Sequence, residues 1–431
     1  MTERSQAAAA ASRGRWVASA CLLGLLALLI RFGLTLPATA EVQLNDFAGY
    51  WGAARVVAEG APERLYDPDR KWFTNLPVVA WALVPLAALD YDRAWQVFWA
   101  LQVASLAACF GVVLLLIARH FPPLTAARAL AAGLLLLCFA PVMRRCLTLG
   151  QTTPFVALLL ALFQLAVHEG WRKLGGALLG LACLIKIPPL LLVFGMGLRR
   201  RLDVAGAALA VVGLGVALSV AGFGGDLVEQ YAQRVIVDNL GRSEAAFNNR
   251  SLDGAFMRAL TDHSLLSWDT VPRPLGVTLA VGSSVAGLLA LLWWRGGSTW
   301  VWPRRAPQLE PPEGDPFDLE LAIGAALSVL VFPVVWIHYY LFLAVPCAVL
   351  PFWWRARRLP LGVVSALLLA AGLWLASGSE VHGNHTVGRH QHEPGFRHEQ
   401  NLQPLGAVLL VVGLGAPLAA IAGDRRRDRL R

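Results

Sequence analysis

The sequence predicts an all-α polytopic membrane protein, and its composition and its apolar runs both support this fold class. Of the 431 residues, 57% are hydrophobic and only 15% are charged, whereas soluble domains carry about a quarter charged residues. Apolar runs that approach the roughly 20 residues needed to cross a hydrocarbon core recur along the chain. These runs are rich in Leu and Ala with little alternation, which favours helices over a barrel.

The positions of the basic residues predict the membrane topology of the chain. The net charge of +9 follows from the Lys and Arg that gather in cytoplasmic loops, so we expect no nucleic acid partner. We expect a multi-pass protein of the inner (plasma) membrane with both termini cytoplasmic. About twelve crossings are expected, over residues 16–36, 92–117, 126–142, 153–168, 174–186, 187–198, 204–222, 275–294, 318–334, 341–354, 361–377 and 404–422.

The first apolar run, residues 16–36, has two interpretations. Ala38-Thr39-Ala40 follows it and has the small-residue form of a signal cleavage site. The run is longer than the apolar region of a typical signal peptide and long enough to span the membrane. We therefore expect a retained first crossing, with cleavage as the alternative.

We expect a single transmembrane domain, residues 1–431, with three outer loops over residues 37–91, 223–273 and 378–402. In the first loop, the helical spacing of apolar residues over 46–59 predicts an interfacial helix. Phe47, Tyr50 and Trp51 are expected to seat that helix in the headgroup layer.

Three apolar segments are too short to span alone and are bounded by Pro or charge. They cover residues 77–89, 174–186 and 187–197. Such pieces are tolerated in a membrane only where they line a cavity inside the protein. The sequence therefore predicts a cavity rather than a plain bundle.

Asp46 begins the interfacial helix, and the sequence leaves two roles open for it. Asp is a favoured N-cap residue and suits the positive end of a helix. A carboxylate on the outer face could also serve as a general base toward a sugar hydroxyl. Tyr50 and Arg55 of the same helix are candidate substrate-binding residues.

Lys186 and Arg145 are candidates for an anion site. Lys186 lies in an apolar stretch just before Pro188 and Pro189, and an intramembrane lysine is a functional candidate by default. It could bind a lipid phosphate, snorkel to the surface, or pair with a carboxylate such as Asp46. Arg145 precedes Gly150-Gln151, where a helix is expected to begin and could bind an anion. A loop whose arginines snorkel is the alternative.

Two further segments carry polar candidates. His338 and Tyr339 fall at an expected outer membrane edge, as routine interfacial aromatics or as groups that donate to a phosphate or assist proton transfer. Asn249 and Arg250, in the second outer loop, suit sugar hydroxyls or phosphates, although a solvated loop would look the same.

The third outer loop is rich in histidine, at positions His382, His385, His390, His392 and His398. The HxxH and HxH spacings could bind a divalent transition metal weakly. No cysteine lies nearby, and the six cysteines of the chain include no CxxC pair. We therefore expect a solvated loop and no metal site.

Taken together and in order, the motifs resemble the polyprenol-phosphate-mannose-dependent mannosyltransferases of the GT-C superfamily. The matching stretches are "DFAGYWGAARVVAEGAPERLYDP", "WFTNLPVVAWALVPLAAL", "LTLGQTTPFVALLLAL", "LGGALLGLACLIKIPPLLL", "NNRSLDGAFMRAL" and "FPVVWIHYYLFLAVP". The resemblance implies a GT-C type multi-span helical bundle with an extracytoplasmic active-site cavity. We expect no cofactor. In this chain Tyr339 stands where the family often has a second His, and Asn75-Leu76-Pro77 stands where it often has Tyr-Pro-Pro.

The resemblance also implies roles for individual residues. The family's catalytic Asp in the first outer loop falls on Asp46, and its outer-edge His falls on His338. In the family, basic groups at the ends of the cavity hold the donor phosphate. Lys186 and Arg145 are the candidates for this role in the present sequence.

The sequence therefore predicts an integral-membrane glycosyltransferase. It would move a hexose, with mannose favoured, from a polyprenyl-phosphate sugar to an envelope glycolipid or glycan, with inversion and without a metal. Membrane lipids are the other expected partners. The expected site residues are Asp46 and His338 for catalysis; Lys186, Arg145 and Tyr339 for the donor phosphate; and Tyr50, Arg55, Gln151, Asn249 and Arg250 for the substrates.

A transporter or flippase without chemistry is the alternative function. A transporter that couples transport to charge would carry carboxylates deep within its spans. The expected spans of this sequence hold almost none, because nearly all Asp and Glu residues fall in loops or at loop edges.

Overall fold

The computed structural model describes residues 45–67, 73–121, 124–296, 316–357, 362–378 and 391–430. The expected first crossing, residues 16–36, lies outside the described residues. So do His382, His385 and His390 of the histidine-rich loop.

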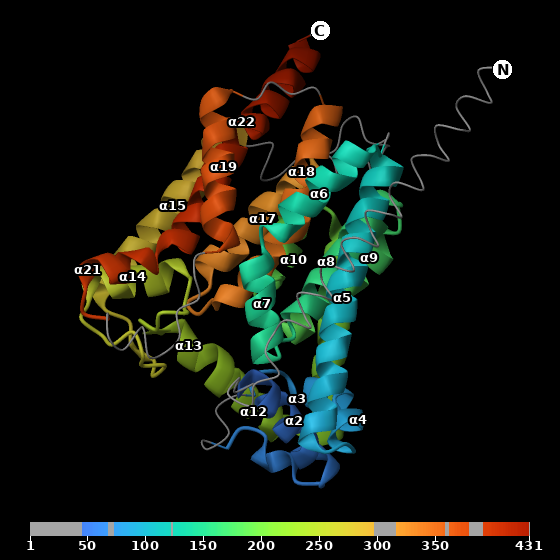
Figure 1. The fold of residues 1–431 in the computed structure, drawn as a ribbon, viewed down its shortest axis with the longest axis vertical. Helices are drawn as coiled ribbons and strands as arrows, with labels where there is room; N and C mark the ends of the chain where they lie inside the picture. Colours follow the sequence, from blue (N-terminus) through green and yellow to red (C-terminus); the bar gives the residue numbers. More distant parts are fainter. Residues whose placement is uncertain are drawn as a thin grey trace, which may run out of the picture.

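The fold is an all-α bundle, as the sequence predicts (Figure 1). Its longer helices are α2 (Asn45–Ala58), α5 (Tyr91–His120), α6 (Ala126–Leu137), α7 (Ala140–Leu149), α8 (Thr153–His168), α9 (Arg172–Ile185), α11 (Leu202–Phe223), α15 (Leu275–Gly296), α17 (Phe317–Val331), α18 (Ala344–Ala356), α19 (Val363–Ser377) and α22 (Leu402–Leu430).

Short helices and one small strand pair connect these elements. The short helices are η1 (Pro62–Arg64), α3 (Pro77–Ala82), α4 (Val84–Ala87), α10 (Leu190–Leu198), α12 (Gly225–Tyr231), the π-helix η3 (Ala232–Val237), α13 (Asp238–Leu240), α14 (Leu252–Leu260), the 3-10 helix η4 (Ile337–Leu343) and α21 (Pro394–Glu399). Strands β1 (Arg242–Ser243) and β2 (Val271–Pro272) pair antiparallel.

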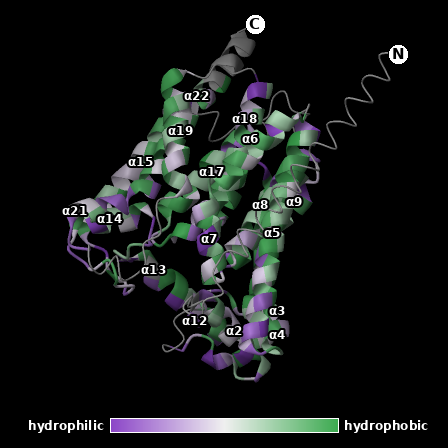
Figure 2. Cartoon of the chain, viewed as in Figure 1, coloured by the Kyte–Doolittle hydropathy of each residue, from purple (hydrophilic) through white to green (hydrophobic). Residues whose placement is uncertain are grey.

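Within the described residues, five helical segments are long and apolar enough to cross a membrane: α5, α11, α15, η4 continued by α18, and α22 as far as Ala419. Helices α6 and α7, bent by 52° at a short break, make a sixth if they count as one span. Hydrophobic residues dominate these segments (Figure 2). The other expected crossings in the described part correspond to shorter helices, so the number of about twelve remains a prediction.

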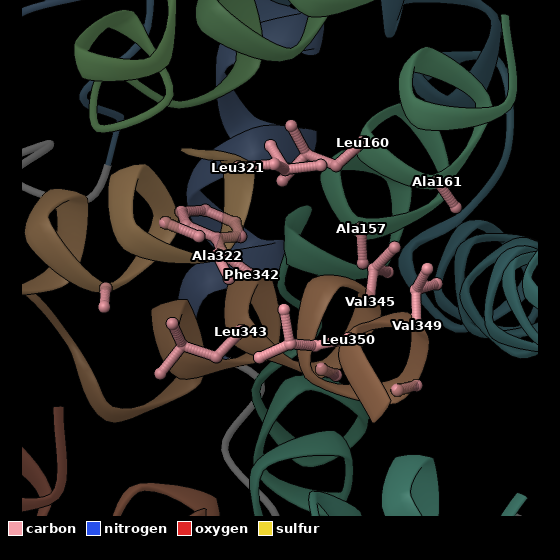
Figure 3. Close-up of a cluster of buried hydrophobic side chains, with 14 of the residues drawn as sticks. Ala157, Leu160, Ala161, Leu321, Ala322, Phe342, Leu343, Val345, Val349 and Leu350 are labelled. Carbon is pink, nitrogen blue, oxygen red and sulfur yellow. The ribbon is translucent and has the colours of Figure 1, made fainter. Parts of the chain in front are cut away.

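Helices α8, α17, η4 and α18 meet in a close-packed apolar core. Leu160, Leu321, Phe342 and Val345 are each at most 2% exposed there (Figure 3). Small residues bring other helices close, since a Cβ on Gly180 of α9 would lie 2.6 Å from the Ala208 carbonyl oxygen of α11. In a membrane such packing stabilises helix pairs through van der Waals contact rather than through release of water.

Helix α2 packs with α3 and α4 at one end of the molecule, against the start of α5 (Figure 1). Phe47 and Tyr50 are 0% and 4% exposed, and their rings lie 5.0 and 6.2 Å from that of Phe98. The prediction that these two aromatics seat the helix in the headgroup layer is therefore wrong. They face the protein because α2 has to cover the end of α5.

Candidate active site

Asp46 lies in the first turn of α2, which begins at Asn45. It therefore follows the first helical residue instead of occupying the N-cap position. Its carboxylate accepts a hydrogen bond from the side chain of Gln151. Tyr50, one turn later, lies on the same face, and its hydroxyl is 3.4 Å from Oγ1 of Thr152. Two predicted site residues thus point from α2 toward the link between α7 and α8.

The link between α7 and α8 is held tightly. Helix α7 continues through Arg145 to Leu149, where a loop was one of the two interpretations of the sequence. It ends at Gly150 in the left-handed conformation with φ of 65°. From α5, Nε2 of the buried Gln102 donates to the backbone oxygens of Cys146, at 3.2 Å, and Gln151, at 2.5 Å. These bonds fix the position of Gln151.

Lys186 follows directly after α9, in extended conformation. The helix ends there because Pro188 and Pro189 have no backbone N–H to continue it. Lys186 is 7% exposed, so it does not snorkel to the surface. Its Nζ donates to Oε1 of Gln151 at 3.0 Å and to the Tyr50 hydroxyl at 3.5 Å, and lies 4.8 Å from the ring centroid of Tyr339.

His338 and Tyr339 enter the same cluster from η4. His338 is 2% exposed, and neither of its ring nitrogens has a hydrogen-bond partner among the described residues. Nε of Arg145 likewise has none in that part of the chain. Lys186 and Arg145 lie close enough to act electrostatically on both Asp46 and His338. Buried polar atoms without partners are rare and are expected where a ligand binds.

The charge state of Asp46 reflects opposing influences. Burial raises the pKa of its carboxyl above the ordinary value, while the bond from Gln151 and the charges of Lys186 and Arg145 act in the opposite direction. A carboxylate with a raised pKa is a stronger proton acceptor than an exposed one. Burial therefore makes the Asp46 carboxylate more basic than an exposed one.

A cavity of about 760 Å³ adjoins this cluster, and Lys186 and Tyr339 form part of its wall. The remaining lining includes the aromatic residues Tyr66, Phe73, Tyr231, Trp268, Phe332 and Trp336. Asn75, also in the wall, donates from Nδ2 to the Ile185 carbonyl oxygen at 2.6 Å, which fixes the end of α9. The predicted cavity is therefore present next to the broken helix.

Three predicted substrate-binding residues lie apart from the cluster. Arg55 is exposed, pairs with Glu59 at 2.8 Å and covers the ring of Trp51. Asn249 and Arg250 are 0% and 1% exposed, so they are not part of a solvated loop. Neither lines the cavity.

Asn249 and Arg250 hold the backbone segment that leads to His338. Val335 donates its N–H to Oδ1 of Asn249 at 3.1 Å, and Arg250 donates its own N–H to the Val335 carbonyl at 2.6 Å. The Arg250 guanidinium donates to Oε1 of Gln400 at 2.7 Å. These bonds support a positioning role, in which the second outer loop aligns the residues that precede η4.

The described residues, which omit three histidines of the third outer loop, contain no group of three or more His, Cys, Asp or Glu side chains placed to hold a metal ion.

Some residues of the site escaped sequence reasoning. Gln102, Asn75 and Thr152 each bond to the cluster or to the backbone that carries it. Gln102 could have been found, because an amide inside an apolar run is costly and signals a buried partner. Asn75 and Thr152 each lie two residues before a proline, between helices, where polar residues are common.

The sequence model of glycosyltransferase family 87 matches residues 73–307, more than half of the chain. The chain belongs to glycosyltransferase family 87. Arg145, Gln151 and Lys186 lie inside the matched region, whereas Asp46 and His338 lie on either side of it. Comparison with curated proteins gives no match. A family 87 chain with several helices able to cross a membrane is a multi-pass membrane glycosyltransferase.

Proposed function

We propose that this family 87 protein transfers a hexose from a polyprenyl-phosphate sugar to a hydroxyl of an envelope glycolipid or glycan. The observation that carries the proposal is the pair of opposite charges joined by Gln151. Its amide bonds the carboxylate of Asp46 on one side and the ammonium of Lys186 on the other, next to a large cavity. A base and a phosphate-binding cation side by side are what this transfer requires.

In the proposed reaction, Asp46 takes the proton of the acceptor hydroxyl, and the oxygen attacks the anomeric carbon of the donor. The bond from that carbon to the phosphate oxygen breaks, and the electron pair leaves with the polyprenyl phosphate. A phosphate is a good leaving group, so no strong general acid is required. We expect inversion, because no second carboxylate joins Asp46 among the described residues of the cluster.

The developing phosphate charge would be stabilised by preorganised cations. Lys186 is the first candidate, and Arg145 and the buried His338, which lie close enough to interact electrostatically with the same cluster, are the others. Tyr339 holds the Lys186 ammonium over its ring. Because side-chain cations supply this charge, we propose a reaction that needs neither a metal nor a cofactor.

The finer identity of the substrates and of the membrane rests on the sequence. Mannose as the hexose follows from the resemblance to polyprenol-phosphate-mannose enzymes. The extracytoplasmic placement of the cavity, the inner membrane and the cytoplasmic termini follow from the basic clusters. We propose that residues 1–431 form one transmembrane domain with outer loops at 37–91, 223–273 and 378–402.

Asp46→Asn is the variant that tests the proposal, in a transfer assay with purified protein, polyprenyl-phosphate mannose and an envelope glycolipid acceptor. Loss of a general base lowers rates by about 10²–10⁴-fold, so we expect a fall of that size in kcat with little change in the donor KM. Glu59→Gln is the control, because Glu59 directly follows the same helix but is exposed and paired with Arg55.

Two outcomes would contradict the proposal in different ways. A wild-type protein that binds the donor lipid but transfers no sugar would favour a flippase or transporter. Transfer at the wild-type rate by Asp46→Asn would leave the enzyme class standing and remove Asp46 as its base.

A further inference from the structure

Glu244 is a buried carboxyl group in the wall of the cavity that the proposed mechanism does not use. It follows strand β1 directly and is 3% exposed. Its backbone oxygen accepts a hydrogen bond from Nδ2 of Asn249 at 3.1 Å, which fixes the residue in place. Oε1 of its side chain has no hydrogen-bond partner in the described part of the chain. Burying such an atom costs free energy unless a ligand supplies the missing partner.

The charges that face Glu244 come from two elements. Arg258 of α14 favours the carboxylate, but its guanidinium donates to the backbone oxygens of Ala246 and Asn249, both at normal distances. Asp269, from the segment before β2, opposes ionisation. Burial outweighs the attraction of Arg258 and raises the pKa of Glu244 to about 8. Near neutral pH the protonated carboxyl can therefore both donate and accept a hydrogen bond.

The cavity that Glu244 lines has several aromatic residues in its wall. Trp268, Trp336 and Tyr231 contribute aromatic side chains to the same cavity lining. Aromatic faces suit the apolar C–H faces of a pyranose, while a neutral carboxyl suits its hydroxyls. A hydroxyl both donates and accepts a hydrogen bond, as the protonated carboxyl does, whereas a phosphate would be repelled once the carboxyl ionises. The ligand expected here is therefore neutral and rich in hydroxyls.

We propose that Glu244 forms a hexosyl subsite of the cavity, in which its carboxyl hydrogen-bonds hydroxyl groups of a bound sugar. This inference rests on the proposed function, and the sugar is either the hexose of the donor or that of the acceptor. A site built to pair a substrate hydroxyl discriminates strongly against an analogue that lacks it, because the buried group is then left unpaired. Glu244 would thus determine which sugar is accepted.

The test compares Glu244→Ala, Glu244→Gln and wild type in the transfer assay, with KM measured separately for the polyprenyl-phosphate sugar and for the acceptor. Loss of a buried hydrogen bond to substrate should raise one KM by about tenfold or more in Glu244→Ala. Whichever KM rises identifies the sugar that is bound. Glu244→Gln should stay near wild type, because an amide also donates and accepts. Glu229→Ala, an exposed carboxylate change in the same outer loop, is the control.

A second measurement separates binding of the sugar from binding of the phosphate. Inhibition by sugar-free polyprenyl phosphate should be unchanged in Glu244→Ala, because that ligand lacks the hexose. A change in this inhibition as large as the change in KM would overturn the subsite. So would two unchanged KM values. If wild type transfers no sugar from the lipid phosphate, the proposed function itself fails and the subsite falls with it.

The pH dependence keeps the inference testable even if Glu244→Ala does not fold. Above pH about 8 the wild-type carboxyl loses its proton and its ability to donate. The affected KM should therefore rise with pH in wild type and stay flat in Glu244→Gln. The same alkaline rise in Glu244→Gln would overturn the proposal.

Discussion

At the scale of single residues, the amide of Gln151 determines how the two charges of the candidate site meet. Lys186 donates to its oxygen at 3.0 Å, and Asp46 accepts from the same side chain. Within the described part of the chain, no ion pair joins Asp46 directly to Lys186. A direct pair would hold the carboxylate in its ionised form too firmly for a base. The amide therefore bridges the two charges, and Lys186 also lines the cavity.

The pH dependence of transfer should report the ionisation of Asp46. Burial raises its pKa above the model-peptide value of 3.8. A base acts only when deprotonated, so kcat/KM should fall as the pH decreases through that raised value. The Lys186 charge lowers the Asp46 pKa, so Lys186→Met should move the acidic limb to higher pH as well as weaken donor binding.

Profiles of kcat/KM against pH for wild type and Lys186→Met test this prediction. Arg55→Met is the control, since Arg55 is exposed and bonds to Glu59, and its profile should match wild type. An acidic limb that stays in place or moves to lower pH in Lys186→Met would contradict the assigned electrostatics.

At the scale of elements, the position of α2 depends on the absence of a side chain at Gly150. This glycine ends α7 with φ of 65°, and a Cβ there would lie 2.5 Å from the Cβ of Phe47. Gly150→Ala should therefore displace α2 and carry Asp46 away from Gln151. We expect a large fall in kcat and a lower Tm.

Gly60→Ala separates the two causes of that effect, which are backbone strain at a positive φ and contact with Phe47. Gly60 follows α2 with φ of 73° but has no atom within 4 Å of the position a Cβ would take. It should show only the backbone strain of about 1–2 kcal/mol. Equal losses of Tm and kcat in the two variants would mean that contact with Phe47 does not matter.

The segment around Asn249 is joined to the chain before η4 through hydrogen bonds that involve its backbone. Asn249 accepts from Val335 N–H, and Ile337 donates its N–H to the Asn248 carbonyl at 3.1 Å. The Tyr340 hydroxyl donates to the Arg250 carbonyl at 2.8 Å. Two segments more than 80 residues apart thus form one unit that presents His338. This arrangement explains why Asn249 and Arg250 are polar although they lie away from the cavity.

At the scale of the whole molecule, a buried ion network joins two halves of the bundle. Glu320 of α17 accepts from Arg199 at 2.6 Å and from Arg201 at 3.0 Å, and all three side chains are at most 6% exposed. Residues 199–201 are three consecutive arginines. Two of them tie the turn between α10 and α11 to α17.

Glu320→Gln should destabilise the protein by about 3–5 kcal/mol, because breaking a buried pair leaves charge without its partner. Thermal inactivation in detergent measures the effect as a shorter half-life at fixed temperature. Glu59→Gln, which removes an exposed pair with Arg55, should leave that half-life unchanged. A half-life for Glu320→Gln equal to that of the wild type would show that the network contributes nothing to stability.

The sequence by itself determined the fold class and much of the helical layout. The expected crossing over residues 153–168 has the same bounds as α8, and the segment 174–186 differs from α9 by two residues or fewer at its ends. These agreements arise because the length of an apolar run and the positions of prolines set the bounds of a helix locally. Lys186 was identified on the same local grounds. A lysine in an apolar stretch before two prolines costs free energy however the rest of the chain folds.

Only the tertiary structure decided which candidates meet. Asp46, Gln151, Lys186 and His338 come from four elements spread over almost 300 residues, and their convergence depends on long-range packing that no spacing encodes. Arg55 lies on the same short helix as Asp46 yet faces solvent with Glu59. In the sequence, Glu244 cannot be distinguished from an exposed loop carboxylate, whereas in the structure it is buried in the cavity wall. Burial and partnership are properties of the whole chain, and they decide whether a polar residue serves chemistry, positioning or solubility.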